Sequence, residues 1–278
     1  MNPIKNVFHP TSVEEAYALK KEHSETSAYV SGCTSLYFSR SAKIEQLINL
    51  KKIPMKEIGI FDDSIEIGAN VTANEIYKSQ LLKKEELQLL IDAGCFIGTN
   101  QLRNAITIGG NLAQIFSWSD LPVALMALDA LVEVFDGTLK KMCILDFIEN
   151  PAGDYGIITK VIIPRVSSKI KTKFIKFAKT KNDYAIFTSA ILLDSDENSK
   201  IRKIRVVVGG CTAKPVRCRS CEDTIIANGL GVANIEKASL RAKEEVQTLS
   251  DFRANAEYRK ELIQVYVKRT LEEFSNEN

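Results

Sequence analysis

The sequence of 278 residues predicts an α+β protein with more than one domain. Its length exceeds one typical domain and fits two. Apolar residues make up 45% of the chain and charged residues 26%, a composition typical of a globular protein that can bury a core. The last third contains several strand-like runs followed by two long helical patterns, which predicts a small sheet covered by helices.

The first predicted helix begins after Ser12. Ser12 is a favourable N-cap, Glu15 three residues later can complete a capping box, and apolar residues follow as far as a helix end within 20–27. Residues 28–30 predict a short strand. The segment 44–50 carries mixed signals, so a strand and a short helix both stay open there.

A hairpin is predicted around Asp62 and Asp63, because apolar, strand-forming residues flank this polar pair on both sides, over 58–61 and 64–69. The other predicted elements of the middle third follow in chain order: a helix start at 72–75, an amphipathic helix over 83–96, an apolar helix over 121–131 with Pro122 in its first turn, a strand over 131–135 with a turn at 136–138, and a strand over 155–163.

The polar segment 167–173 predicts a domain boundary, since it separates the strand before it from a new block of strands. Beyond it the sequence predicts strands over 174–178, 185–193 and 203–208, a hairpin turn at 194–199, and helices over 234–249 and 254–274. This block is the sheet-and-helix layer of the predicted fold class.

Charge and hydropathy argue against several function classes. The net charge is +2 and Lys and Arg are spread along the chain, which gives no argument for nucleic acid or an anionic membrane as a partner. No apolar run approaches the ~20 residues that span a bilayer, and the run 123–134 contains Asp129 and Glu133. Residues 1–5 do not resemble the start of a signal peptide, so we expect a cytoplasmic protein without membrane contact.

Six cysteines are scattered along the chain, and in the expected compartment disulfides are not predicted. Cys218 and Cys221 form one close pair, with Cys211 seven residues before it. Three thiols without a fourth or a nearby histidine make a poor iron–sulfur site. We interpret them as free thiols in a loop, with a weak metal or redox site as the alternative.

Two small-residue loops are the candidate binding segments. In the run Thr107–Ala113, the pair Gly109-Gly110 follows β-branched residues, and such a pair allows a turn with positive φ and a close approach to a bulky anion. Consecutive N–H groups in such a turn form an anion-binding nest. Thr107 and Asn111 flank the pair with side chains that can reach phosphate oxygens or sugar hydroxyls.

The other candidate loop, Ser31–Ser35, follows a short apolar run at Tyr29 and Val30. In chain order, Ser31–Ser35 is the first loop and Thr107–Ala113 is the second loop. Two such loops could hold the two phosphates of one dinucleotide. An ordinary turn at each glycine position is the alternative interpretation.

A longer string surrounds the glycine pair. Residues 97–104 (Ile-Gly-Thr-Asn-Gln-Leu-Arg-Asn) run into Thr107–Ala113, and 119–122 (Ser-Asp-Leu-Pro) and 125–130 follow. In this string the chain resembles the FAD-binding medium subunit of molybdenum hydroxylases, a family that includes xanthine dehydrogenase, carbon monoxide dehydrogenase and nicotinate dehydrogenase. The resemblance covers nearly the whole chain, with weaker matches at 174–176, 183–185, 207–210, 215–217, 251–253, 258–259 and 268–269.

The resemblance implies a fold similar to that of vanillyl-alcohol oxidase, with two α+β subdomains that clasp FAD and a C-terminal α+β domain. On this basis we predict a first FAD-binding subdomain over 1–55, a second over 56–166 and the C-terminal domain over 167–278.

The resemblance also implies that the two loops wrap the pyrophosphate of FAD. Carried over by motif, the first-loop contacts are Gly32, Cys33, Thr34 and Ser35, and the second-loop contacts are Thr107, Gly109, Gly110 and Asn111. No catalytic residue and no metal ligand is predicted.

Two further positions, Asp120 and Lys176, are implied by the resemblance. Asp120 matches a carboxylate near the ribose and adenine end, where it can accept hydroxyl hydrogen bonds. Lys176 lies near the position of a lysine beside the flavin, where a cation would stabilise the reduced anion. Two alternatives stay open: Asp120 as only the N-cap of the following helix, and Lys176 as a solvated surface lysine.

The first loop departs from the family pattern at Cys33. The family's loop usually reads Ala-Gly-Gly-Thr, whereas this chain has Ser-Gly-Cys-Thr at 31–34. A non-glycine residue with positive φ costs about 1 kcal/mol or more. We therefore expect either a reshaped first loop or weaker FAD binding.

Electron transfer is the function that the resemblance implies. A large molybdopterin subunit would oxidise an N-heterocycle or similar substrate, and a small subunit with 2Fe–2S clusters would pass the electrons to FAD on this chain. FAD would then reduce NAD(P)⁺ or another acceptor. The alternatives are an FAD-free scaffold or assembly subunit of the same complex, and a stand-alone flavoprotein oxidase.

Overall fold

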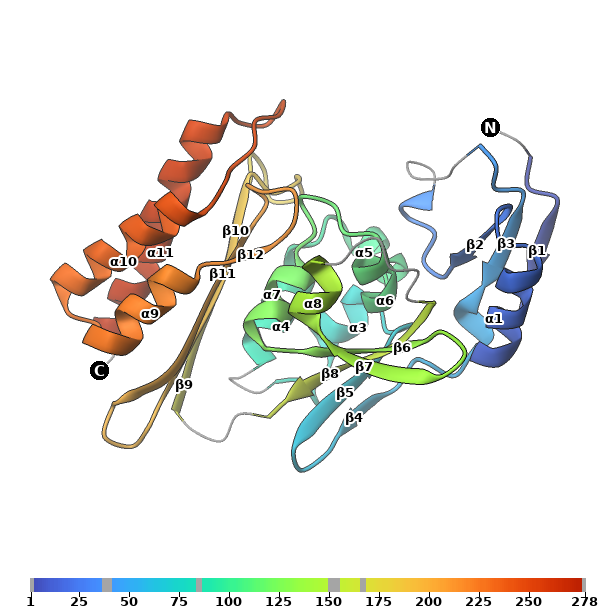
Figure 1. Cartoon of the computed structure of the whole chain (residues 1–278), viewed down its shortest axis with the longest axis horizontal. Coiled ribbons are helices and arrows are strands. Elements are labelled where there is room, and N and C mark those ends of the chain that lie inside the picture. The colour runs from blue at the N-terminus through green and yellow to red at the C-terminus, as the bar shows by residue number, and fades with distance from the viewer. Residues whose placement is uncertain (1–2, 37–41, 84–86, 150–155, 166–168, 277–278) are drawn as a thin grey trace. The chain divides into compact units, whose positions relative to one another are not determined.

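The computed structural model describes residues 3–36, 42–83, 87–149, 156–165 and 169–276. The chain forms two compact units, each discontinuous in sequence (Figure 1). The first unit comprises Met1–Glu75, Thr99–Gln114 and Ala130–Ile163, and the second comprises Ile76–Gly98, Ile115–Asp129 and Pro164–Asn278. The α+β class is confirmed, and the predicted division into three sequential domains stays a prediction.

A parallel three-stranded sheet carries the first loop in the first unit. Its strands are β1 (Asn6–Phe8), β2 (Ser27–Val30) and β3 (Gln46–Asn49), in the order β1-β3-β2. The helix α1 (Val13–Glu22) connects β1 to β2 and begins as predicted, because Ser12 Oγ accepts the Glu15 N–H at 3.1 Å. Of the two alternatives for the segment 44–50, the strand is the main one, since β3 is followed by only a short 3-10 turn over Leu50–Lys52.

A five-stranded sheet forms the rest of the first unit, in the order β4-β5-β8-β6-β7. The hairpin predicted around Asp62 and Asp63 is present, with β4 (Ile58–Ile60) antiparallel to β5 (Ser64–Gly68). The strand predicted over 131–135 is β6 (Leu131–Phe135), which pairs antiparallel with β7 (Leu139–Cys143) beyond the predicted turn. The remaining elements are β8 (Ile157–Pro164) and the short helices α5 (Asn100–Ala105), α6 (Ile108–Ala113) and α8 (Ile144–Glu149), while α3 (Ala73–Lys78) begins in this unit.

The second unit is a sheet with helices on both faces. The strands β9 (Lys169–Phe177), β10 (Phe187–Ser195), β11 (Ile201–Gly209) and β12 (Val216–Arg217) are antiparallel in the order β12-β11-β10-β9. Every residue of β10 is buried. One face is covered by α9 (Arg219–Asn228), α10 (Val232–Glu245) and α11 (Ala256–Asn276), and α4 (Gln88–Phe96) and α7 (Leu121–Ala127) pack on the strands from the other side (Figure 1).

Several predicted boundaries shift. The apolar helix predicted over 121–131 ends at Ala127, because Asp129 adopts a left-handed conformation (φ 50°) that stops the helix before β6. The helix predicted over 83–96 is described only as α4 from Gln88, since 84–86 lie outside the described residues. Residue Tyr155 of the predicted strand at 155–163 also lies outside them.

The cysteine cluster is buried in a core. All six cysteines are free, and Cys211, Cys218 and Cys221 are fully buried in the hydrophobic core of the second unit. Burial raises the pKa of the Cys211 thiol to about 12 and the pKa values of the other two well above their usual range. The predicted loop holds for Cys211, which lies between β11 and β12. It is wrong for the other two, because Cys218 occupies the N-cap position of α9 and Cys221 packs inward from its first turn.

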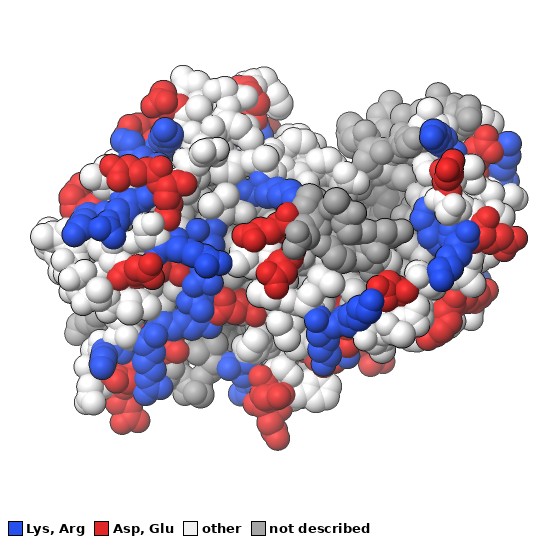
Figure 2. Space-filling view, in the orientation of Figure 1, with Lys and Arg blue, Asp and Glu red and all other residues white. Residues whose placement is uncertain are grey.

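Among the described residues, no group of three or more His, Cys, Asp or Glu side chains is arranged to hold a metal ion. In the same part of the chain, no helix is long and apolar enough to cross a membrane. Figure 2 shows Lys and Arg interspersed with Asp and Glu on the face in view, in keeping with the small net charge.

Candidate functional site

The first loop presents unpaired backbone donors. Within the described residues, the N–H groups of Gly32, Cys33 and Thr34 make no backbone hydrogen bond. Cys33 is exposed and adopts the left-handed conformation, with φ 59°, that the sequence predicted to be costly. Consecutive N–H groups around a left-handed residue form a concavity that binds anions. The loop therefore has the geometry of an anion-binding nest, in spite of the missing glycine, and its predicted contact with phosphate stays a prediction.

Gly32 brings the first loop into contact with the chain that leads to the second. A Cβ at Gly32 would lie 2.0 Å from the carbonyl oxygen of Ala105, so only glycine fits at this close approach. The structure thus places the two predicted loops side by side in the first unit.

The second loop differs from its prediction. Gly109 and Gly110 form the first turn of α6 and neither has a positive φ. Thr107 is the N-cap of this helix, and its Oγ1 accepts the Gly110 N–H at 3.1 Å. The prediction of a left-handed N–H nest at the glycine pair is therefore wrong.

Two backbone N–H groups of the second loop donate to carbonyls of the segment 69–71. The Ile108 N–H donates to the Val71 carbonyl at 2.9 Å, and the Gly109 N–H donates to the Ala69 carbonyl at 3.0 Å. Gly109 is required there because a Cβ would lie 2.7 Å from the Ala69 Cβ. The glycine thus serves the packing of α6 on the segment that follows β5.

Two features of the second loop still fit a ligand. Gly110 is exposed, and an added Cβ would meet only Thr107 Oγ1. The Oδ1 atom of Asn111 is buried and has no hydrogen-bond partner in the described part of the chain, which costs free energy unless another group supplies one. Three free donors in one loop and an unpaired amide in the neighbouring loop suit a phosphate that is attached to a hydroxyl-bearing or amine-bearing group.

Asp120 and Lys176 contact each other in the second unit. Lys176 Nζ donates to Asp120 Oδ2 at 2.8 Å and to the Phe96 carbonyl at 2.9 Å, and the two side chains are 5% and 3% exposed. The interpretation of Lys176 as a solvated surface lysine is therefore wrong. Asp120 holds the N-cap position of α7, but its side chain makes no capping hydrogen bond.

The second carboxylate oxygen of this pair has no partner. Asp120 Oδ1 is buried and unpaired among the described residues. Burial raises the pKa of Asp120 to about 6, although the charge and hydrogen bond of Lys176 act in the opposite direction. A hydroxyl donor that reaches Oδ1 would stabilise the ionised form.

The contact also constrains the roles predicted for the two residues. Groups that touch each other act on the same part of a ligand, whereas the adenine and flavin ends of an extended FAD lie far apart. The predicted assignment of Asp120 to the adenine end and of Lys176 to the flavin cannot hold for both residues at once.

Arg253 lies in the weak family match at 251–253, but the sequence predicted no role for it. It is 9% exposed and donates to the Ala185 carbonyl at 2.7 Å and to Ser117 Oγ at 3.1 Å, and it pairs with Asp251. Its guanidinium also lies 5.3 Å from the ring centroid of Trp118. These contacts fix the segment that leads to Asp120, three residues beyond Ser117.

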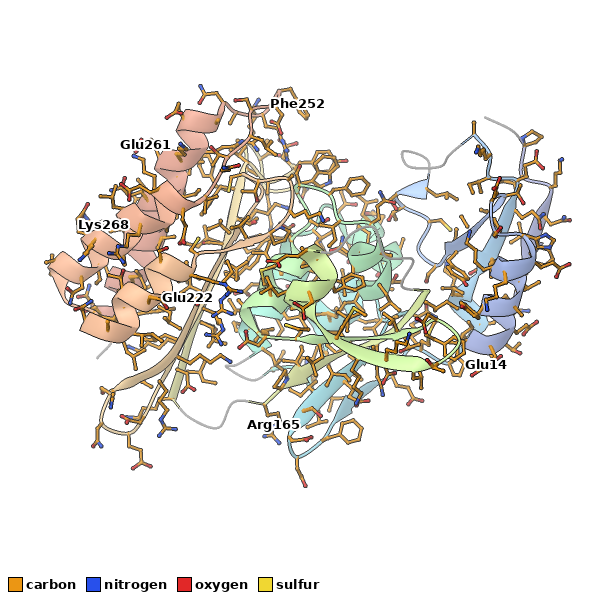
Figure 3. The ribbon with its side chains drawn as sticks, in the orientation of Figure 1. Glu14, Arg165, Glu222, Phe252, Glu261 and Lys268 are labelled. Carbon is orange, nitrogen blue, oxygen red and sulfur yellow. The ribbon has the colours of Figure 1, made fainter. Side chains whose placement is uncertain are left out.

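Aromatic side chains surround this guanidinium. Trp118 stacks on Phe116 with ring centroids 4.9 Å apart and contacts Tyr184 at 4.7 Å, and Tyr184 is half exposed. Phe252 projects from the loop before α11 and is 83% exposed (Figure 3). The only tryptophan in the sequence therefore packs within an aromatic cluster two residues before Asp120.

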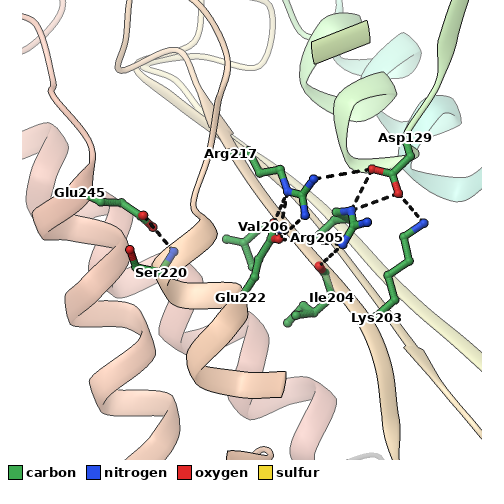
Figure 4. Close-up of polar contacts among 9 residues, drawn as sticks. All are labelled: Asp129, Lys203, Ile204, Arg205, Val206, Arg217, Ser220, Glu222 and Glu245. Carbon is green, nitrogen blue, oxygen red and sulfur yellow. Dashed lines mark hydrogen bonds and ion pairs between the residues drawn. The ribbon is translucent and has the colours of Figure 1, made fainter. Parts of the chain in front are cut away.

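A second ionic cluster is structural (Figure 4). Asp129 pairs with Arg205 at 2.8 Å and with Lys203, and Glu222 accepts hydrogen bonds from Arg217 and from the Val206 N–H. Although burial alone would raise it, the hydrogen bonds from Arg205 and Lys203 hold the pKa of Asp129 below its usual value. The cluster ties the end of α7 to β11, β12 and α9.

Models of known families match nearly all of the chain. Residues 2–166 match the FAD binding domain in molybdopterin dehydrogenase, and residues 173–274 match the CO dehydrogenase flavoprotein C-terminal domain.

Two similar curated proteins come from Paenarthrobacter nicotinovorans. The nicotine 6-hydroxylase medium subunit is 30% identical over 284 residues, covering 98% of this chain and 97% of its own. The 6-hydroxypseudooxynicotine dehydrogenase complex subunit alpha is 28% identical over 270 residues, covering 94% and 90%. Among solved structures, a chain of quinoline 2-oxidoreductase from Pseudomonas putida 86 has the same fold, with a TM-score of 0.88 at 19% identity over 98% of each chain.

Proposed function

Because the chain belongs to the FAD-binding medium subunits of the molybdenum hydroxylases, we propose that it is the electron-transfer subunit of a holoenzyme with a large molybdopterin subunit and a small 2Fe–2S subunit. Membership of this family makes it an oxidoreductase subunit with FAD as its cofactor. Bound FAD would take electrons from the 2Fe–2S clusters and deliver them to NAD(P)⁺ or another acceptor.

The first loop would hold the pyrophosphate. The unpaired N–H groups of Gly32, Cys33 and Thr34 supply consecutive donors, and the hydroxyls of Thr34 and Ser35 lie in the same turn. Charge-assisted hydrogen bonds of this kind are stronger than neutral ones. This row of free donors is the observation that carries the proposal.

The second loop would contribute in two ways. Thr107 and Gly109 support it from inside, one by capping α6 and the other by close packing on Ala69. Gly110 and Asn111 would face the cofactor, because one is exposed without a side chain and the other carries the unpaired buried amide oxygen.

Asp120 and Lys176 would act together at one place on FAD. Asp120 Oδ1 would accept a hydroxyl, and Lys176, which uses two of its three N–H donors within the protein, would direct the third to an electron-rich edge. The ribityl hydroxyls adjoin the pyrimidine edge of the flavin, so both contacts are available there. The positive charge of Lys176 would stabilise negative charge on the flavin.

Reconstitution of the purified chain with FAD tests this proposal. We expect bound flavin with visible absorbance, and a rise in melting temperature with added FAD. In the assembled holoenzyme, Gly110→Trp should remove FAD and stop reduction of NAD⁺ or NADP⁺, while the substrate still reduces the 2Fe–2S clusters. Chain that neither retains flavin nor gains stability with FAD would overturn the proposal.

The same measurements separate the alternatives. A scaffold subunit without FAD predicts a stable complex that lacks flavin absorbance, and a stand-alone oxidase predicts turnover of an organic substrate by the isolated chain.

We also propose a cytoplasmic location, because six free thiols suit a reducing compartment.

A further inference from the structure

We propose that Asn70 is a positioning residue for cofactor binding, which through Ser31 holds the first loop in the left-handed turn that exposes its N–H donors. This inference rests on the proposed role of that loop in holding a pyrophosphate. Asn70 follows β5 and is 6% exposed.

The side chain of Asn70 is fully used. Its Oδ1 accepts the Ser31 hydroxyl at 2.8 Å, and its Nδ2 donates to the carbonyls of Leu50 at 2.9 Å and Ile53 at 3.4 Å. Two carbonyl acceptors on one end and a hydroxyl donor on the other fix which way the amide points. Asn70 therefore anchors Ser31, the residue just before the free donors, to the turn after β3.

The neighbours of Asn70 anchor the second loop. Ala69 and Val71 accept the N–H groups of Gly109 and Ile108 through their carbonyls. The Asn70 N–H itself donates to the Met55 carbonyl at 2.7 Å. Three consecutive residues thus connect both loops to the body of the first unit, and Asn70 is the one that does so through its side chain.

Cys33 explains why such an anchor is needed. A glycine at this position would enter the left-handed region without strain, whereas Cys33 at φ 59° does so at a cost. The free energy that a satisfied buried hydrogen bond contributes to stability is of the same order as this cost. The Ser31–Asn70 bond accordingly offsets the strain, so the loop keeps the conformation in which Gly32, Cys33 and Thr34 present their N–H groups.

Ser31→Ala is the mild variant that tests the inference, because it deletes only the hydroxyl bonded to Asn70. We expect the dissociation constant of FAD for the full chain to rise about fivefold to tenfold. In a Ser31→Ala, Cys33→Gly double variant the affinity should return to within about twofold of that of Cys33→Gly alone, since glycine needs no anchor. Asn70→Ala should follow the same pattern with a larger loss.

Ser64→Ala is the matched control, because Ser64 Oγ bonds to Asp63 in the exposed β4–β5 hairpin of the same unit. Its FAD affinity should equal that of the wild type. Flavin fluorescence gives the affinity, and the melting temperature of the FAD-free chain separates a loss of folding from a loss of positioning.

The outcomes are distinct. Wild-type chain that binds FAD, with Ser31→Ala binding equally tightly, would overturn the inference and leave the proposed function standing. A loss of affinity in Ser31→Ala that Cys33→Gly does not rescue would also overturn it. Failure of the wild-type chain to bind FAD would overturn the proposed function and this inference together.

Discussion

Cys33 shows how one residue can keep a backbone conformation that its side chain disfavours. We expect Cys33→Gly to raise the free energy of unfolding by about 0.5–1 kcal/mol, because relief of strain at φ 59° exceeds the entropy that glycine adds to the unfolded chain. Urea unfolding measures this change. Cys33→Ala is the control and should bring no gain, since alanine meets the same steric cost. An equal gain from both variants would place the effect in the thiol and not in the backbone.

At the same scale, Asp120 predicts a pH dependence. Burial raises its pKa to about 6 from an ordinary value of 3.8, with Lys176 opposing this shift. Between about pH 4 and 6 the folded chain therefore keeps a proton that the unfolded chain has released. The free energy of unfolding falls with rising pH across this window, by about 3 kcal/mol for this group.

In the Asp120→Asn variant, the free energy of unfolding should not show this fall between about pH 4 and 6, because asparagine does not titrate. Urea unfolding at several pH values across the window, compared with the wild type, measures it. Asp136→Asn is the control, because Asp136 is paired with Lys140 at the surface and its pKa is lowered. Parallel profiles for the wild type and Asp120→Asn would mean that Asp120 keeps an ordinary pKa in the folded chain.

The two glycine loops make different demands at the scale of elements. Gly32→Ala places a Cβ 2.0 Å from a backbone oxygen of the neighbouring segment, which cannot move aside as a side chain can. We expect a loss of about 1–3 kcal/mol in the free energy of unfolding, together with a loss of FAD binding. Gly110→Ala is the comparison: its Cβ meets the Thr107 Oγ1 hydroxyl at 2.9 Å, which weakens the cap of α6, while alanine favours the helix over glycine. Because these two effects oppose each other, the stability of the chain without FAD should stay close to that of the wild type. Equal losses in both variants would contradict this account of the loops.

Helix starts were the elements best predicted from sequence. The capping signals at Ser12 and Thr72 are both realised, with Thr72 and Glu75 exchanging hydrogen bonds at the start of α3. The nest predicted at the glycine pair is instead a helix start, because Thr107 is also a capping residue and the helix that follows is only six residues long. Such a short helix has no hydrophobic period to reveal it.

For the whole molecule, removal of FAD is the test of function that reaches beyond single residues. Free FAD at 100 times its dissociation constant should stabilise the chain by about 2.7 kcal/mol, because only the folded chain has both loops in place. Thermal unfolding of stripped and reconstituted chain measures this difference. Riboflavin, which lacks the pyrophosphate, is the matched ligand and should stabilise far less. Equal stabilisation by the two ligands would place the binding energy away from the loops.

Local sequence features predict the α+β class, the hairpin around Asp62 and Asp63, the turn at 136–138, the long C-terminal helices and the family string around the glycine pair. These follow from short-range features, namely turn residues, caps and apolar periodicity, which depend on neighbours in the chain. The cost of a left-handed conformation at Cys33 is likewise predictable from sequence, because it depends on the type of that one residue.

Which side chains meet depends on tertiary packing. Lys176 pairs with Asp120 across 56 residues, and Ser31 bonds Asn70 across 39. No local pattern encodes such partners, because their contact depends on how strands and loops pack. The same packing turned the glycine pair into a helix start, by directing its N–H groups to the carbonyls of Ala69 and Val71. In the first loop, by contrast, the N–H groups of Gly32, Cys33 and Thr34 make no backbone hydrogen bond within the described residues.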